Sequence, residues 1–184
     1  MRNQDIQGQI LSMKQIDALL SSSPNDGSLE SARTRAIMEL LYSTGVTLKE
    51  LITLKNEDID FTGEVLIVAR SGLRKKRIVT LSSRASKVVS TYFQMKESKV
   101  GDEPIFVLED GQKISTAFVG KMLKKQLELA GLDQLNLSVP QLLRHNFAVG
   151  MRAHGSEWKD LQELLGHLRA DSTRRAYKDI IIPE

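Results

Sequence analysis

Residues 141–180 read "QLLRHNFAVGMRAHGSEWKDLQELLGHLRADSTRRAYKDI", and the spacing of their apolar side chains predicts three consecutive helices. The first helix has Pro140 in its opening turn and ends at Gly155. Ser156 is the expected cap of the second helix, and Asp171 or Ser172 is the expected cap of the third. This segment therefore predicts a helical C-terminal part.

The rest of the chain predicts further helices and one hairpin. Two β-branched runs, residues 64–70 and 76–81, flank a turn that contains Gly72, which is typical of an antiparallel pair of strands. Helical spacing recurs before and after this hairpin, in residues 11–23, 31–45, 47–55, 82–99 and 115–131. We expect an α+β fold: one mainly α-helical domain with a small antiparallel β-sheet.

Composition narrows the class of protein. The chain of 184 residues is long enough for one domain with a substantial core. It contains no cysteine, so disulfides and thiolate metal sites are excluded. No apolar run approaches the ~18 residues that a membrane span needs. The first residues are polar and lack the apolar block of a signal peptide. We expect a cytoplasmic protein that needs neither a metal nor another cofactor and does not bind a membrane.

Positive charge is concentrated at the hairpin. The formal net charge is only +3, but residues 70–77, "RSGLRKKR", carry five cations and no acid. Such a local cluster is the electrostatic footprint of a nucleic-acid contact, and the alternative is a solvated basic hairpin. We expect DNA contacts from this hairpin at Arg70, Arg74, Lys75, Lys76 and Arg77.

Four reactive side chains, Arg144, His145, His167 and Tyr177, fall within the C-terminal helical segment. A tyrosine hydroxyl can attack phosphorus to form a phosphotyrosyl ester. Arginine presents a planar pair of donors that matches two phosphate oxygens, and histidine can hydrogen-bond the same phosphate or move a proton. The set suits phosphoryl transfer in which side chains, rather than a metal, stabilise the developing charge.

The order and spacing of these residues resemble a known family. "LLRHNFA" with Arg144 and His145, "LLGH" ending at His167, and "STRRAY" ending at Tyr177 resemble the C-terminal signature of tyrosine recombinases, which include phage integrases and Xer-type recombinases. "RTRAIMELLYSTGVTLKELITLKNEDID" resembles the first motif of that family, and the basic hairpin resembles the one that holds its catalytic lysine. The resemblance runs from about Ser12 to Tyr177.

This resemblance implies a site-specific DNA recombinase or integrase. Tyr177 would attack a scissile phosphate of double-stranded DNA, release a 5′-hydroxyl and form a 3′-phosphotyrosyl link, without a metal. Arg144 would clamp the phosphate, and His167 would support it. For His145 we expect a contact with the DNA or support of the site, and the alternative is a packing role. The family fold implies that residues 1–184 form the catalytic domain, without the N-terminal core-DNA-binding domain, and that copies assemble as a tetramer on DNA. The role in a mobile element or in the chromosome stays open.

The chain departs from the family pattern at three positions. Thr47 stands where the family has an arginine, and Gln141 stands where it has histidine or lysine. The catalytic lysine is displaced: Arg70 or Ser71 occupies its place, and Lys75 follows a few residues on. Removing one preorganised donor to a developing oxyanion costs on the order of 10²–10³ in rate.

These departures leave several interpretations open. The chain is an enzyme that recruits an arginine from elsewhere, with Arg33 and Arg35 as candidates, or an impaired recombinase, or a DNA-binding or regulatory module of the same fold. A purely structural helical protein is a further alternative, against which the basic hairpin argues. Retention of Tyr177 favours the enzyme.

Overall fold

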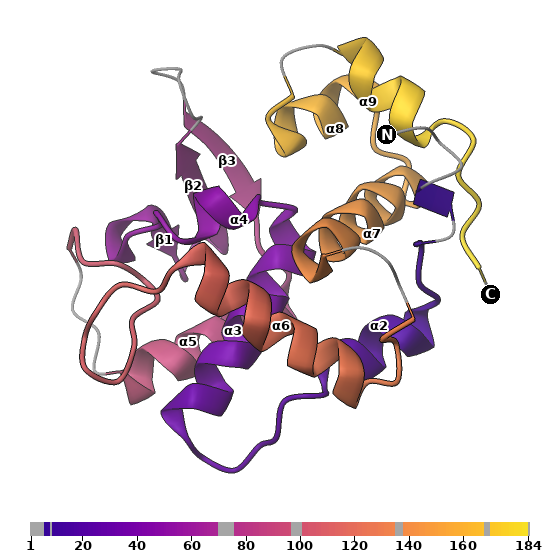
Figure 1. Ribbon diagram of the computed structural model, residues 1–184. Coiled ribbons are helices and arrows are strands. Elements are labelled where there is room, and N and C mark those ends of the chain that lie inside the picture. Colours follow the sequence, from indigo (N-terminus) through magenta and orange to yellow (C-terminus); the bar gives the residue numbers. More distant parts are fainter. Residues whose placement is uncertain are drawn as a thin grey trace.

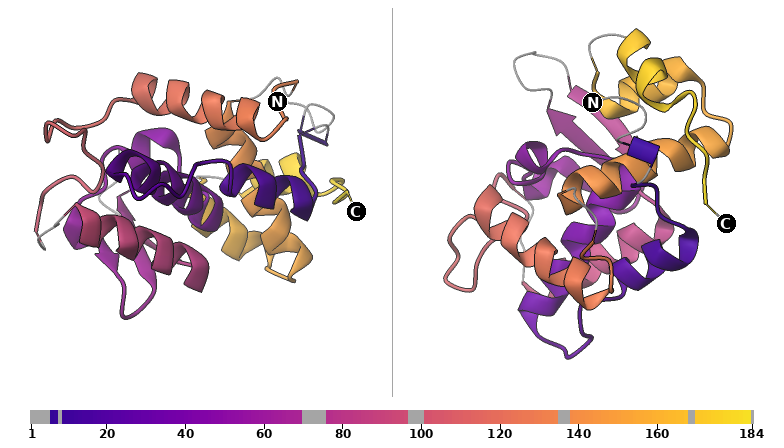
Figure 2. Two further views of the ribbon diagram at one scale, coloured as in Figure 1. Left: turned by 90° about the horizontal axis from the view of Figure 1, so that it is seen from below. Right: turned by 45° about the vertical axis from the view of Figure 1, so that its right-hand side comes forward.

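The computed structural model describes residues 6–7, 9–69, 76–96, 101–134, 138–167 and 170–183. Helix α3 (Leu29–Thr44) lies at the centre, with α5 (Ser83–Met95) and α6 (Thr116–Leu129) on opposite sides of it, as Figure 2 shows. Helices α2 (Met13–Leu20), α4 (Leu48–Leu51) and α7 (Val139–Ala153) complete this group. In Figure 1, α7 lies between this core and the pair formed by α8 (Trp158–Leu165) and α9 (Ala170–Tyr177).

The predicted hairpin is present and belongs to a small antiparallel sheet. Its strands are β2 (Val65–Ala69) and β3 (Lys76–Thr80), with Ile67 opposite Ile78. A short strand that the sequence did not predict, β1 (Ile59–Asp60), pairs with β2 after a 3₁₀ turn at Asn56–Asp58. The mainly helical α+β fold that the sequence predicted is therefore confirmed.

Caps define the ends of several helices. The Ser12 hydroxyl accepts the Gln15 amide, and the side-chain oxygen of Gln15 accepts the Ser12 amide, so α2 begins with a capping box. Two predicted caps are wrong. Glu157, not Ser156, precedes α8, and α9 already includes Ala170, so Asp171 and Ser172 lie within its first turn.

Two apolar clusters hold the fold together. The larger one fills the space between α2, α3, α5, α6, α7 and the sheet, with Leu40, Leu66 and Leu123 fully buried. The smaller one packs Ile6 and Ile10 against α7, α8 and the buried ring of Tyr177. Burying a side chain of this size stabilises the fold by about 1.5–3 kcal/mol. The ring of Tyr177 is thus part of this smaller apolar cluster.

The two ends of the described chain lie together. The Gln7 side chain donates to the Ile181 carbonyl and accepts the Ile181 amide, each at 2.8 Å. This pair joins the N-terminal segment to the residues that follow α9. None of the helices in the described residues is long and apolar enough to cross a membrane.

Candidate active site

Six of the predicted site residues, those outside the hairpin, meet in one open pocket of about 470 Å³. It lies where the start of α4, one face of α7, the turn after α8 and helix α9 come together. The residues that line it are Ile6, Thr47, Gln141, Arg144, His145, His167, Ser172, Arg175, Ala176 and Tyr177. The fold therefore brings together side chains that are up to 171 positions apart along the chain, because Ile6 and Tyr177 both contact this space.

Arg144 is anchored at the pocket wall by backbone carbonyls. Its guanidinium donates to the carbonyl oxygen of Gly45 and, at 2.7 Å, to that of Leu165. Gly45 ends α3 in the left-handed region, with φ of 61°, and a Cβ there would lie 2.3 Å from the Phe147 ring. Only glycine fits this position, so the end of α3 and the orientation of Arg144 depend on each other. Burial lowers the pKa of Arg144, an effect that the nearby Glu50 opposes.

His167 is held in one tautomer. Its Nε2 lies 3.1 Å from Nη2 of Arg144, and its Nδ1 lies 2.7 Å from the Thr173 hydroxyl. Since a guanidinium can only donate, Nε2 is the acceptor and Nδ1 carries the proton that is donated to Thr173. Burial and the charges of Arg144 and Arg77 lower the pKa of His167 to about 4, so the ring is neutral near pH 7.

Tyr177 faces His145 rather than His167. Its hydroxyl lies 2.7 Å from Nδ1 of His145, and both residues are buried. Burial raises the pKa of Tyr177 to about 12, although the charge of Arg144 acts in the opposite direction. Burial and Arg144 lower the pKa of His145 to about 4. At neutral pH the phenol therefore keeps its proton and the imidazole is uncharged.

Thr47 occupies the pocket as a helix cap. Its hydroxyl accepts the Glu50 amide and donates to the Glu50 carboxylate at 2.9 Å, which forms the capping box of α4. Burial would raise the pKa of Glu50, but hydrogen bonds from Arg77 and from the Thr47 backbone outweigh burial, and the pKa is lowered. Thr47 thus brings a hydroxyl that is already engaged, and no charge.

Arg77 does not have the place that the sequence predicted. Its side chain is 4% exposed, and its guanidinium binds Glu50 through two hydrogen bonds and the Leu164 carbonyl through a third. The alternation of β3 explains the difference, because Arg77 and Val79 face inward while Lys76 and Ile78 face outward. This corrects the expectation that Arg77 is a surface cation available to DNA.

The remaining predicted residues divide into three groups. Lys76 is exposed on β3, as a DNA contact requires. Gln141 lines the pocket at the start of α7, where its side-chain oxygen accepts the Ser138 hydroxyl. Three predicted hairpin residues, Arg70, Arg74 and Lys75, lie outside the described residues.

The cations expected to compensate for Thr47 do not line the pocket. Arg33 is buried, donates to the Val107 carbonyl and lies over the Phe118 ring, while Arg35 pairs with Asn25. Arg175 does line it, on α9, with an exposed side chain. Sequence reasoning missed Arg175, although it stands two positions before Tyr177 in "STRRAY". Within the described chain, no hydrogen bond or ion pair engages its guanidinium.

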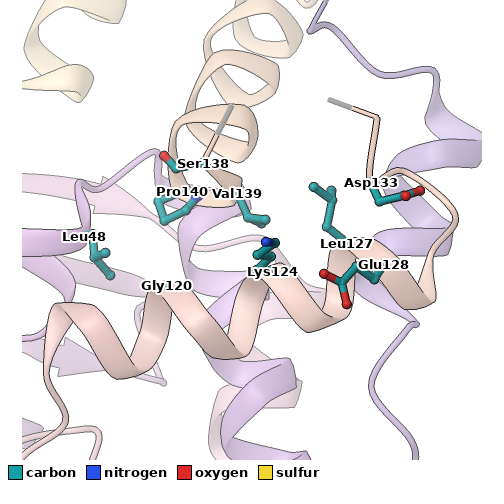
Figure 3. A pocket seen from close by; sticks show the side chains of 9 residues that line it. All are labelled: Leu48, Gly120, Lys124, Leu127, Glu128, Asp133, Ser138, Val139 and Pro140. Carbon is teal, nitrogen blue, oxygen red and sulfur yellow. The ribbon is translucent and has the colours of Figure 1, made fainter. Parts of the chain in front are cut away.

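A second hollow of about 280 Å³ lies between α6 and the start of α7 (Figure 3). Aliphatic side chains, among them Leu48, Leu127 and Val139, form much of its wall, and Lys124, Glu128 and Asp133 lie around it. Arginine, histidine and tyrosine are missing from its described lining. The chemistry that the sequence predicts therefore belongs to the first pocket.

Known sequences match this chain over most of its length. The model of the phage integrase family matches residues 9–180. "Tyrosine recombinase XerC" of Syntrophus aciditrophicus is 33% identical over 174 residues, which cover 90% of this chain and 55% of that protein. "Tyrosine recombinase XerD" of Corynebacterium glutamicum is 34% identical over 169 residues, 89% of this chain and 55% of the relative. The chain spans about half the length of the curated relatives it matches.

Solved structures show the same fold. The crystal structure of XerA recombinase superimposes with a TM-score of 0.81 at 26% identity, over 94% of this chain and 60% of that one. The catalytic domain of bacteriophage HP1 integrase gives a TM-score of 0.65 at 20% identity, over 91% and 85% of the two chains. XerH bound to its difH substrate before cleavage gives a TM-score of 0.78 at 21% identity, over 91% of this chain and 49% of that one.

Proposed function

We propose that this chain, which belongs to the phage integrase family, cleaves and rejoins DNA strands at specific sites through a 3′-phosphotyrosyl intermediate. One observation carries the proposal. Tyr177 lines the same pocket as an arginine and a neutral histidine whose nitrogens lie 3.1 Å apart. A nucleophile and a preorganised set of phosphate donors thus share one space of suitable size.

Tyr177 is the nucleophile. Its oxygen forms a bond to the scissile phosphorus as the bond to the 5′ oxygen breaks, and the phosphodiester becomes a protein–DNA ester of similar energy. The 5′-hydroxyl of another strand then reverses the step. With a pKa of about 12, the phenol is unreactive until a phosphate is bound.

Arg144 and His167 are the phosphate donors. The hydrogen bonds from Arg144 to the carbonyls of Gly45 and Leu165 fix the direction of its guanidinium. Little conformational freedom is therefore lost when a phosphate binds. Nε2 of His167, now an acceptor from Arg144, exchanges that partner for the phosphate only when it gains a proton or the ring changes tautomer. The negative charge of the phosphate favours that protonation.

Arg175 is our candidate for the cation that Thr47 does not supply. Its exposed guanidinium lines the pocket from the helix that carries Tyr177. A bound phosphodiester gives this arginine an anionic partner, which the described residues do not. This assignment replaces Arg33 and Arg35 in the interpretation that an arginine is recruited from elsewhere.

Double-stranded DNA is the proposed partner, and residues 1–184 are proposed to act as the catalytic domain on it, in the cytoplasm. The exposed Lys76 on β3 supports contact with the DNA backbone beside the pocket. Several copies, four in a tetramer, are proposed to assemble on the DNA, and the exposed side chains of Ile181 (73%) and Ile182 (43%) support such assembly. We propose Lys75 as the general acid for the leaving oxygen.

A DNA-binding module with feeble chemistry is the second candidate. The engaged hydroxyl of Thr47 and the buried, protonated Tyr177 favour it. A duplex with a nick close to the cleavage position separates the two, since loss of the short fragment prevents rejoining and traps the covalent product. An adduct that resists denaturation and disappears in Tyr177→Phe supports the enzyme. Salt-sensitive binding without an adduct supports the module.

A further inference from the structure

We propose that His145 accepts the proton of Tyr177 during strand cleavage; this inference rests on the proposed function. The two side chains come from different helices, α7 and α9, and meet in the pocket wall. Nδ1 of His145 lies 2.7 Å from the phenol oxygen, within the range that direct proton transfer requires. The ring centroids are 5.7 Å apart, so the contact is made by the polar edges.

The partners of the two ring nitrogens of His145 show which group donates in the hydrogen bond with Tyr177. Nε2 of His145 is buried and has no partner among the described residues. If Nδ1 carried the proton, the buried Tyr177 hydroxyl would have no acceptor and Nε2 would also be unpaired. If Nε2 carries the proton, Nδ1 accepts from Tyr177 and a single group is left unpaired. The second arrangement loses fewer hydrogen bonds, so the phenol donates to His145.

Three other polar side chains of the pocket are less suited to this role. Both ring nitrogens of His167 are engaged, Nε2 by Arg144 and Nδ1 by Thr173. Gln141 has an amide, which does not take up a proton at neutral pH, and it accepts from Ser138. Thr47 is bound to Glu50.

The proton balance of the step is complete. The O–H bond of Tyr177 breaks as its oxygen forms a bond to phosphorus, and the proton moves to Nδ1 of His145. The bond between phosphorus and the 5′ oxygen breaks, and that oxygen takes a proton from the general acid, for which Lys75 is the candidate. Rejoining reverses both transfers, so His145 returns the proton to Tyr177.

The charges around His145 explain why transfer waits for substrate. Arg144 precedes it on α7, Arg175 lines the same pocket from α9, and neutral His167 faces the pocket from the turn after α8. Behind the pocket wall, Arg77 and Glu50 form an ion pair. This surplus of positive charge disfavours an imidazolium. A bound phosphodiester adds the negative charge that stabilises it.

The first test reads the tautomer without DNA. In ¹⁵N-histidine-labelled protein, long-range ¹H–¹⁵N spectra distinguish a protonated ring nitrogen from an unprotonated one. We expect Nδ1 of His145 to be unprotonated and Nε2 to be protonated from pH 6 to 9. A proton on Nδ1 throughout this range would overturn the inference, whatever happens to cleavage.

The second test needs a DNA substrate, which is selected from a randomised pool of nicked duplexes by covalent capture on the wild-type chain. Single-turnover cleavage of the selected duplex is then measured. Because neutral His145 is available above about pH 5, the wild-type rate should not rise with pH from pH 6 to 9. In His145→Gln the reaction needs hydroxide or tyrosinate. The cleavage rate should therefore fall by about 10²–10⁴-fold at pH 7 and rise about tenfold for each pH unit above it. His154→Gln, at the exposed end of α7, is the matched control and should match wild type.

A substrate with a bridging 5′ sulfur separates the two ends of the reaction, because a thiolate leaves without a proton. The His145→Gln defect should persist on this substrate. A full rescue would assign His145 to the leaving group and overturn the inference, as would a flat pH profile in the variant. Failure of the wild-type chain to form any adduct would overturn the proposed function itself.

Discussion

Glu50 and the buried Arg77 form a partly buried two-point ion pair, with Nη1 to Oε1 at 2.5 Å and Nη2 to Oε2 at 3.0 Å. This pair connects the two sides of the pocket wall. Glu50 also binds Thr47 at the start of α4, and Nε of Arg77 binds the carbonyl of Leu164 at the end of α8. Arg144 binds the next carbonyl, that of Leu165. Two guanidiniums therefore satisfy the free carbonyls at the end of α8 and fix the turn that presents His167.

We predict that Glu50→Gln destabilises the fold by about 3–5 kcal/mol at pH 7, because it leaves the buried charge of Arg77 unpaired. The pKa of Glu50 is lowered in the folded state, so its contribution is present above its ordinary value of 4.5 and is lost as the pH falls through the folded value. Urea unfolding from pH 7 down to pH 3 should show this loss in wild type and a shallower dependence in the variant.

The matched control for this prediction is an exposed pair. Lys55 and Asp102 lie 3.8 Å apart with side chains that are 45% and 83% exposed. Asp102→Asn should change the free energy of unfolding by less than about 0.5 kcal/mol. Equal effects of the two variants would show that the buried pair does not support the pocket wall.

We predict that Gly45→Ala destabilises the protein by about 2–4 kcal/mol and reduces cleavage. The backbone at Gly45 has φ of 61°, and the new Cβ would overlap the Phe147 ring. The carbonyl that accepts from Arg144 would move with it. Gly111→Ala is the control, because φ there is 80° but no atom lies within 4 Å of a Cβ, so only the backbone cost of about 1 kcal/mol is expected. Thermal or urea unfolding measures the loss of stability in each variant, and equal losses would contradict the prediction for Gly45.

We predict that Arg175→Gln lowers the cleavage rate by about 10²-fold, since it removes the cation that faces the phosphate. Arg174 is its neighbour on α9, is also exposed and does not line the pocket. Arg174→Gln should alter the rate by less than about threefold, apart from weaker binding at high salt. Measuring single-turnover rates with saturating protein removes the contribution of binding. Similar rates for the two variants would argue against the recruitment of Arg175.

We predict that Thr47→Arg raises the cleavage rate by about 10-fold or more, because it restores a cation at a position that lines the pocket. The change also removes the cap of α4, which costs about 0.5–2 kcal/mol of stability. Thr47→Gln removes the same cap without adding charge and is the control. If both variants are slower than wild type, position 47 no longer serves as a phosphate-binding position.

Local chemistry explains why the main elements were predictable from sequence. Ser12 and Ser115 cap their helices, Gly45 ends α3, and the β-branched runs around Gly72 form the hairpin strands. The inward orientation of Arg77 was also present in the sequence, since it alternates with Val79 along β3. The concentration of cations in 70–77 obscured that period-two signal.

The partners of the site residues depend on long-range packing and could not be predicted in the same way. No sequence pattern pairs Glu50 with Arg77, or turns Tyr177 toward His145 rather than His167. These contacts follow from how α4, β3, α7 and α9 pack. Arg175 illustrates the same point: its helical position relative to Tyr177 did not indicate which of the two adjacent arginines faces the pocket.

The most direct test of the central claim is to locate the covalent bond. The wild-type chain is trapped on the nicked duplex, digested with a protease and a nuclease, and analysed by mass spectrometry. We expect the residual nucleotide mass on the peptide that contains Tyr177, and on neither of the other tyrosines, Tyr42 and Tyr92. A nucleotide attached to another residue, or DNA bound and released without any covalent product, would contradict the account.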